Sequence, residues 1–124
     1  MTDEELGALA YCYLTTKGRR SGSPHTIEIW FALHGEAVYL LAGGGDGSDW
    51  VKNVRSDPTV GLRLGDRDLI CKGRLVGDPE EDVLARRLLL EKYRPRYSGE
   101  LEEWARTALA VAIDLPPDES PRPS

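Results

Sequence analysis

The residues best suited to bind an anion form a short basic segment near the N-terminus. Lys17, Arg19 and Arg20 stand within four residues, and no acidic residue occurs between Glu5 and Glu28. The three cations are surrounded by threonines, serines and glycines. Arginine binds phosphate through paired hydrogen bonds, and the backbone amides of a turn can form a nest for an anion. The segment therefore predicts an anion site, and its alternative is a solvated hairpin tip.

A glycine tract at residues 43–47 is the second candidate, because it leads directly into Ser48, Asp49 and Trp50. Glycine lets the backbone approach a flat ligand closely. A helix beginning near Asp49 would add a weakly positive end that could face an anion. A flexible connection explains the tract equally well. The spacing is not the G-x-G-x-x-G of a dinucleotide-binding fold, so a Rossmann site is not indicated.

Side chains for conventional acid–base or nucleophilic catalysis are few. The two histidines, His25 and His34, form no zinc-protease motif, and the chain has no G-x-S-x-G elbow. Cys12 and Cys71 are far apart, without metal-ligand spacing, and are expected to be buried as small hydrophobes. We therefore predict no metal site and no catalytic side chain, so that an enzyme built on this sequence would take its chemistry from a cofactor.

The length and charge of the chain narrow the class of protein. The 124 residues suit one domain, predicted at 1–115 with a disordered tail at 116–124. Sixteen basic and 21 acidic residues give a net charge of −5, which argues against nucleic-acid binding. No apolar run approaches the roughly 20 residues of a membrane span. The acidic start has no hydrophobic signal region and predicts a cytoplasmic protein.

Short strands are the elements that must position these groups. Alternating apolar residues predict six strands, at about 11–16, 27–33, 38–42, 60–64, 69–76 and 107–113. Helices are predicted at about 2–10, 49–56, 78–92 and around 101–104, the third packing Val83, Leu84, Leu88 and Leu89 inward. Strands this short and evenly spaced favour a mainly antiparallel sheet or a small closed barrel.

Two strand faces carry unusual side chains. Trp30 falls on the polar face of its predicted strand, beside Glu28, so it is either covered by another element or available to a ligand. The last predicted strand carries Ala108, Ala110 and Ala112 on one face, which suits a close neighbour.

Two motifs connect the basic segment to a known family. Residues 14–24 read LTTKGRRSGSP and residues 50–60 read WVKNVRSDPTV. The threonine-rich strand, the G-R-[KR]-[ST]-G-x-P turn and the W-x-x-N-x-x-x-[ND]-P-x-V segment, in this order, resemble the deazaflavin-dependent nitroreductase family over about residues 9–78. The resemblance implies a six-stranded antiparallel split β-barrel with inserted short helices, related to pyridoxamine-phosphate-oxidase-like FMN-binding proteins.

The resemblance also implies a binding site for the deazaflavin coenzyme F420. The phosphate and lactyl-glutamyl tail would be held by the basic segment, through Lys17, Arg19, Arg20, Ser21, Gly22 and His25. Relatives often carry an arginine where His25 stands. The ring system would receive backbone contacts from Ala42, Gly43 and Gly44, and Trp50 and Asn53 would line the pocket. Trp30 and Tyr97 would lie on the side of the hydride acceptor.

The implied activity is hydride transfer from reduced F420 to a small electron-poor acceptor, a quinone, an enone or a nitro compound. Two alternatives stay open: a reductase of the same fold that uses FMN, and a non-catalytic carrier or sensor for a flavin-like or apolar ligand. A homodimer is predicted, with a monomer as the alternative, and the alanine face of the last strand is the candidate contact surface.

Overall fold

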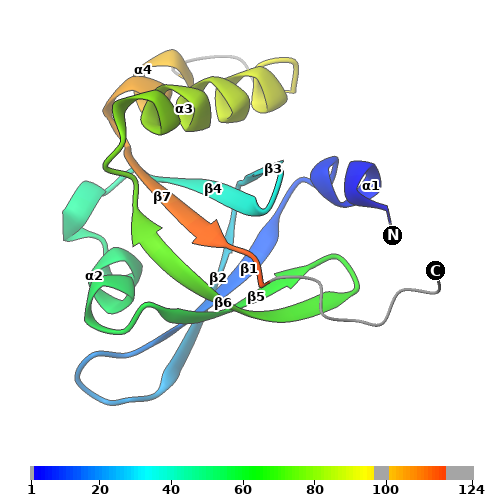
Figure 1. Ribbon diagram of the computed structural model, residues 1–124. Helices are drawn as coiled ribbons and strands as arrows, with labels where there is room; N and C mark the ends of the chain where they lie inside the picture. The colour runs from blue at the N-terminus through cyan, green and yellow to red at the C-terminus, as the bar shows by residue number, and fades with distance from the viewer. Residues whose placement is uncertain (1, 97–100, 117–124) are drawn as a thin grey trace.

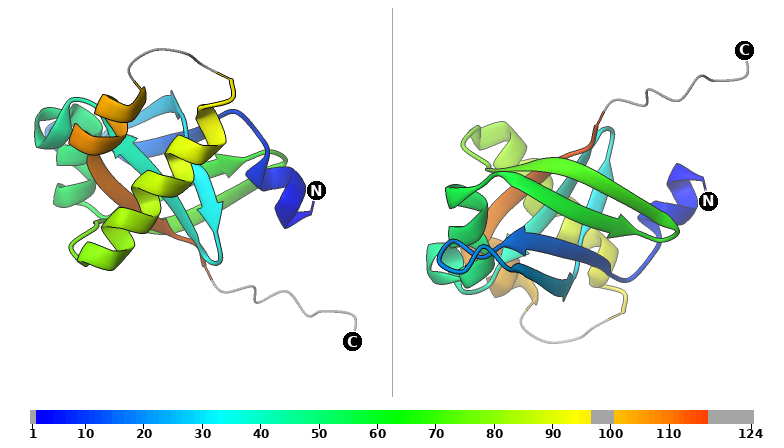
Figure 2. Two further views of the ribbon diagram at one scale, coloured as in Figure 1. Left: turned by 90° about the horizontal axis from the view of Figure 1, so that it is seen from above. Right: turned by 90° about the horizontal axis from the view of Figure 1, so that it is seen from below.

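The computed structural model describes residues 2–96 and 101–116 (Figure 1). An antiparallel sheet of seven strands, in the order β2-β1-β5-β6-β7-β4-β3, curls on itself into a half-barrel (Figures 1 and 2). Its strands are β1 (Cys12–Lys17), β2 (Pro24–Ile29), β3 (Ala32–His34), β4 (Ala37–Ala42), β5 (Thr59–Leu64), β6 (Arg67–Leu75) and β7 (Leu109–Asp114). The mainly antiparallel barrel predicted from the sequence is confirmed.

The helices of the described residues are α1 (Asp3–Gly7), α2 (Asp49–Ser56), α3 (Pro79–Tyr93) and α4 (Leu101–Thr107), with a short 3-10 helix, η1 (Gly45–Gly47), before α2. Local sequence explains where two of them begin. Thr2 and Glu5 form a capping box at α1, and the Asp78 side chain caps α3, whose first residue is a proline. Helices α3 and α4 lie side by side over the face of β4 and β7 (Figures 1 and 2).

The strand predicted at 27–33 is wrong, because this segment forms two strands and raises their number from six to seven. Strand β2 ends at Ile29, and β3 begins at Ala32 at the opposite edge of the sheet. At the break, the Phe31 backbone N–H donates to the Tyr93 hydroxyl at 3.0 Å, and Lys92 Nζ donates to the Phe31 carbonyl at 2.8 Å. Helix α3 therefore satisfies the backbone that a strand neighbour would otherwise pair.

Apolar side chains form two cores on opposite faces of the curled sheet. The barrel interior buries one group, which includes Cys12, Leu14, Leu62, Val111 and Ile113. The second core lies between the sheet and the helices α3 and α4, where Ala85, Leu89 and Tyr93 are the buried residues of α3. Val83, which was expected to face inward, is instead 65% exposed.

The alanine face of the last strand belongs to this second core. Ala110 and Ala112 are fully buried and pack in the same cluster as the inward residues of α3. The predicted close neighbour is therefore a helix of the same chain. A homodimer contact through this face is wrong, because α3 and α4 already cover it.

Tyr93 connects α3 to the break between β2 and β3 and to the segment that precedes β1. Its hydroxyl accepts from the Phe31 N–H and donates to the Ala10 carbonyl at 2.7 Å, and the residue is 1% exposed. We expect Tyr93→Phe to lower the free energy of unfolding by about 1–2 kcal/mol, since it leaves buried backbone groups without a partner. Urea denaturation measures the change. Tyr11→Phe, at an exposed tyrosine, is the control and should change stability by less than about 0.5 kcal/mol; equal effects would contradict this role.

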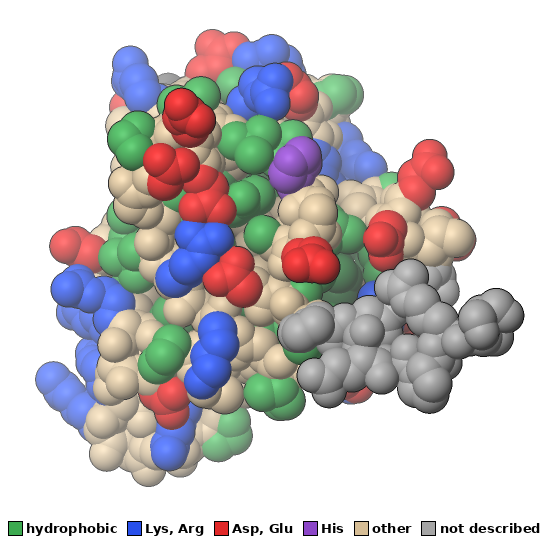
Figure 3. All heavy atoms as spheres, viewed as in Figure 1, with side chains coloured by type: hydrophobic (Ala, Val, Ile, Leu, Met, Phe, Trp, Pro, Cys, Tyr) green, Lys and Arg blue, Asp and Glu red, His purple; other side chains and the backbone are tan. Residues whose placement is uncertain are grey.

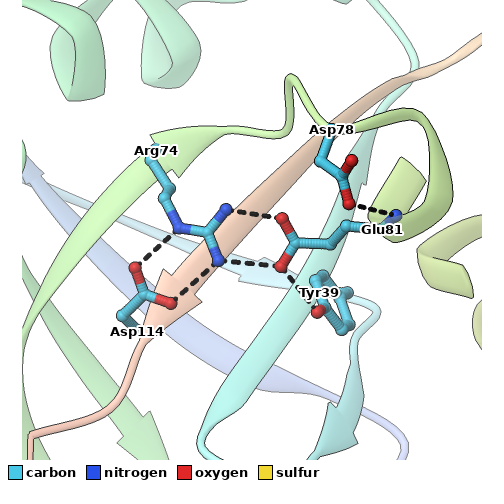
Figure 4. A network of polar contacts seen from close by, with 5 residues as sticks. All are labelled: Tyr39, Arg74, Asp78, Glu81 and Asp114. Carbon is cyan, nitrogen blue, oxygen red and sulfur yellow. Dashed lines mark hydrogen bonds and ion pairs between the residues drawn. The ribbon is translucent and has the colours of Figure 1, made fainter.

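A network around Arg74 ties the end of β7 to β6, β4 and α3 (Figure 4). The Arg74 guanidinium donates to both oxygens of Glu81 at 2.6 and 2.8 Å and to both oxygens of Asp114 at 2.7 and 3.1 Å. The Tyr39 hydroxyl donates to Glu81 at 2.8 Å. These hydrogen bonds lower the pKa of Glu81 to about 2, and burial together with the bond to Glu81 raises the pKa of Tyr39 to about 12.

The two cysteines are buried free thiols, as the sequence predicts. Burial raises the pKa of Cys12 to about 12 and that of Cys71 to about 11, so both thiols stay protonated near neutral pH.

Among the described residues, no helix is both long and apolar enough to cross a membrane. All of the predicted tail except Pro116 lies outside the described residues.

Candidate functional site

The basic segment forms the turn between β1 and β2, next to α2. Backbone hydrogen bonds close the turn, from the Gly18 N–H to the Ser23 carbonyl and from the Gly22 N–H to the Gly18 carbonyl, both at 2.8 Å. Gly22 has a φ of 73°, a left-handed conformation that favours glycine. Lys and Arg side chains gather at this end of the molecule, at the lower left of Figure 3. The turn is therefore an ordered support for cationic side chains.

Asn53 of α2 holds Arg19 in place through hydrogen bonds. Its side-chain oxygen accepts hydrogen bonds from the Arg19 guanidinium at 3.0 Å and from the Arg19 backbone N–H at 3.3 Å. Its side-chain amide donates to the Thr16 hydroxyl at 3.1 Å, and both residues are buried. Asp49 adds an ion pair with Arg19 at 3.4 Å. The Arg19 guanidinium is thus oriented by α2 before any ligand arrives.

His25 lies against the turn because position 18 is a glycine. Its partner in the β1–β2 pairing is Thr16. A side chain at Gly18 would place its Cβ 2.8 Å from His25 Nε2 and 2.8 Å from the Ser21 hydroxyl. Glycine at this position therefore lets the imidazole and the Ser21 hydroxyl close over the backbone of the turn.

These groups face a cavity of about 700 Å³ between the turn, β2 and α2. Six of the residues predicted to bind the coenzyme line it together: Arg19, Arg20, Ser21, His25, Trp50 and Asn53. The remaining lining is Thr16, Gly18, Pro24, Thr26, Ile27 and Asp49. Cationic and hydroxyl groups thus share one cavity with apolar walls, a combination that suits a ligand with an anionic end and a flat apolar end. We call it the large cavity.

Lys17 and Gly22, two other predicted binding residues, lie on a different side of the turn. They line a second cavity of about 500 Å³, which Arg19, Arg20 and Ser21 also border. The second cavity extends to Ser56 and Asp57 at the end of α2. The predicted basic site is therefore divided by the backbone of the turn, with the two arginines accessible from both sides.

The glycine tract does not line the large cavity. Ala42 is buried at the end of β4, whereas Gly43 and Gly44 are exposed, and none of the three lines the large cavity. Gly44 packs under the next helix, since a Cβ there would lie 2.6 Å from the Ser48 hydroxyl oxygen. The tract, which includes η1, connects β4 to α2, the helix that carries Trp50 and Asn53.

Trp30 lies in a separate, mostly apolar cavity of about 420 Å³, which we call the aromatic cavity. Its lining residues are Tyr11, Glu28, Ile29, Trp30, Leu41, Leu101 and Trp104. The Trp30 ring stacks on Tyr93 with centroids 4.3 Å apart and meets Trp104 edge-on at 5.4 Å. Tyr93 of α3 thus covers one face of the Trp30 ring, while Trp30 still borders the aromatic cavity. Tyr97 lies outside the described residues.

Several residues of the two cavities were not singled out as site residues from the sequence. Thr16 and Asp49 lie in the two candidate segments of the sequence, but their contacts with Asn53 and Arg19 join segments more than 25 residues apart and leave no local signal. Ile27 could have been found, because alternation along β2 places it on the same side as His25. Trp104 had a weaker signal, as an aromatic residue in a short predicted helix.

Solved structures share this fold. A protein described as an F420-H2 dependent reductase (FDR-A) matches with a TM-score of 0.69 and 22% identity, over 85% of this chain and 94% of that one. A pyridoxamine 5′-phosphate oxidase-like protein from Listeria innocua matches with a TM-score of 0.65 and 17% identity, over 89% and 86%. A protein described as a domain-swapped dimer matches with a TM-score of 0.70 and 22% identity, over 85% and 80%. These similarities confirm the split-barrel fold.

Sequence comparison identifies the family. No curated protein matches the chain. The family model described as F420H(2)-dependent quinone reductase matches residues 3–116, which is nearly the whole chain. This match confirms the predicted deazaflavin-dependent oxidoreductase and its coenzyme F420. The chain belongs to the F420H2-dependent quinone reductase family.

Proposed function

We propose that this protein reduces a quinone with reduced F420 bound in the large cavity. The observation that carries the proposal is that Arg19, Arg20 and His25 line the same cavity as the apolar side chains of Trp50 and Ile27. Guanidinium groups suit the phosphate of the coenzyme, and apolar walls suit its ring. The residues present therefore fit F420, and the family match supports the same coenzyme.

The chain contributes binding and orientation to this reaction. When bound, reduced F420 supplies a hydride and a proton, so that a quinone gains two electrons and two hydrogens and leaves as a hydroquinone. Arg19, held by Asn53, would fix the coenzyme phosphate, and Trp50 would close one side of the ring site. Correct placement and exclusion of water are the main protein contributions to hydride transfer, which needs no acid–base side chain.

The aromatic cavity is the proposed acceptor site. Ile27 lines the large cavity and Ile29 lines the aromatic cavity, so the two cavities follow one another along β2. On β4, Leu41 borders the aromatic cavity and directly precedes the segment 42–44 proposed to contact the coenzyme ring. A quinone beside Trp30 would therefore lie next to the ring site. Lys17 and Gly22, across the turn, are proposed to contact the outer part of the glutamyl tail.

Anaerobic turnover tests the proposal. Reduced F420, the purified protein and a naphthoquinone should yield oxidised F420 and hydroquinone in equal amounts, at a rate proportional to protein. Binding of F420 without oxidation across quinones, enones and nitro compounds would instead indicate a carrier or sensor. A yellow purified protein that ignores F420 would indicate the FMN-dependent alternative.

Asn53 is proposed to act on the coenzyme through Arg19. We expect Asn53→Ala to raise the dissociation constant of F420 by about tenfold, because Arg19 keeps its charge and loses its orientation. A double-mutant cycle with Arg19→Ala measures the coupling. In the Arg19→Ala background, Asn53→Ala should have little further effect on binding. Two independent, additive losses would show that Asn53 does not act through Arg19.

The expected homodimer remains a prediction. The neighbour described as a domain-swapped dimer supports it. Its contact surface would have to be other than the alanine face of β7, which α3 and α4 cover.

A further inference from the structure

The aromatic cavity has the opposite charge from the large cavity. Glu28 is the one charged side chain among the described residues that line it, and the rest are aromatic or aliphatic. The large cavity is bordered by Arg19 and Arg20, with Asp49 already paired to Arg19. Both cavities lie along β2, whose residues 24–27 border the large cavity and whose residues 28–29 border the aromatic cavity. A ligand spanning the two would therefore meet cations at one end and an anion at the other.

The charge of Glu28 is not cancelled by a neighbouring cation. Within the described residues Glu28 has no ion pair, and its hydrogen bond comes from the neutral Tyr13 hydroxyl at 2.9 Å. Arg63, the residue paired with Tyr13 on the next strand, donates instead to both oxygens of Asp68, at 2.8 and 3.3 Å. Among the described residues, no cation therefore pairs with the Glu28 carboxylate, which is exposed and lines an otherwise apolar cavity.

We infer that Glu28 makes this protein select neutral or cationic quinones over anionic ones. The inference rests on the proposed function, in which the acceptor occupies the aromatic cavity. A quinone carrying a carboxylate or sulfonate would be repelled by Glu28, whereas a neutral ring would pack against Trp30 and Trp104 without penalty. The same charge would keep the anionic tail of the coenzyme out of the acceptor site, and so orient it toward Arg19 and Arg20.

Glu28→Gln tests the inference, since glutamine removes the charge and can still accept the Tyr13 hydrogen bond. The substrates are 1,4-naphthoquinone and its 2-sulfonate, compared as a ratio of kcat/KM values within each protein. We expect the variant to shift this ratio toward the sulfonate by about 3- to 10-fold, mainly through KM, and the shift to shrink at 0.5 M salt as charges are screened. Glu36→Gln, at an exposed carboxylate of the β3–β4 turn, is the matched control and should leave the ratio unchanged.

Binding without coenzyme gives a second readout. Quinones should quench the fluorescence of Trp30 and Trp104, and the dissociation constant of the sulfonate should fall in Glu28→Gln by the same factor, while that of the neutral quinone stays constant. If the wild type reduces the neutral quinone and both ratios are unchanged in the variant, charge selection by Glu28 is overturned and the proposed function stands. If the wild type oxidises no reduced F420 with any quinone, the proposed function fails and the inference fails with it.

Discussion

Replacing Arg19 and Arg20 together with alanine is expected to weaken F420 binding by at least two orders of magnitude. Both guanidiniums border the large cavity, and a hydrogen bond to a charged group contributes about 1.5–3 kcal/mol. Two such losses amount to about 3–6 kcal/mol, which exceeds the roughly 2.8 kcal/mol that corresponds to a hundredfold change in affinity. An equilibrium titration followed by the fluorescence of the coenzyme measures the dissociation constant at a fixed salt concentration.

A matched double variant separates a specific site from general electrostatic attraction. Arg67→Ala combined with Arg87→Ala removes the same charge from exposed arginines on β6 and α3, outside the large cavity. This control should change the dissociation constant by less than about threefold, because exposed charges beyond the Debye length are screened. Equal losses in the two double variants would show that net charge, and not the basic turn, attracts the coenzyme.

Arg74→Met is expected to destabilise the fold by about 1–3 kcal/mol, a figure reduced for solvent screening because the Arg74 side chain is 42% exposed. It removes four charge-assisted hydrogen bonds and leaves the carboxylates of Glu81 and Asp114 facing one another (Figure 4). Urea denaturation provides the measurement. Arg63→Met is the control: its partner Asp68 is 70% exposed, and such a pair contributes less than about 1 kcal/mol. A loss at Arg74 no larger than at Arg63 would contradict this role.

The same network predicts how the free energy of unfolding depends on pH. Hydrogen bonds from Arg74 and Tyr39 lower the pKa of Glu81 from 4.5 to about 2. A carboxyl with a lowered folded-state pKa contributes stability that is complete above its unfolded pKa and lost as the pH falls through the folded value. We expect the wild type to lose about 1–2 kcal/mol between pH 5 and pH 2 through this group, a figure reduced for solvent screening. Glu81→Gln should remove that part of the pH dependence.

Local patterns predicted most of the elements of the scaffold. Along β1 and β5, apolar side chains alternate because every second residue faces the barrel interior. The sequence pattern therefore placed Leu14 and Leu62 in the core. Asp78 and Pro79 marked the start of α3, because a helix cap depends only on residues a few positions apart. The rotation of α3 was harder, since apolar residues occur nearly all around it. Its contact with β7 buries Ala85 and Leu89 and leaves Val83 exposed.

The break between β2 and β3 could not be predicted locally. The residues 27–33 alternate as one strand would, yet the Phe31 backbone bonds to Tyr93, 62 residues later in the chain. Such a contact depends on how α3 docks against the sheet, which strand periodicity does not encode. The alanine face shows the same limit: the small residues correctly indicated a close neighbour, and only the structure identified that neighbour as α3.

The sequence predicted which residues belong to the candidate site better than it predicted how those residues are arranged. The motifs placed Arg19, Trp50 and Asn53 near one ligand, and the large cavity brings these three together. The buried bond from Asn53 to Thr16, and its hold on Arg19, depend on α2 packing against β1 across 34 or more residues of sequence. The division of the basic segment between two cavities likewise follows from the path of the turn backbone, which composition does not reveal.

A crystal structure of the protein with F420 bound tests the central proposal most directly. We predict that the coenzyme phosphate lies within hydrogen-bond distance of the Arg19 or Arg20 guanidinium in the large cavity, and that the deazaflavin ring lies between Trp50 and the aromatic cavity. A coenzyme whose phosphate contacts neither arginine, or whose ring lies away from both cavities, would contradict the assignment of this site.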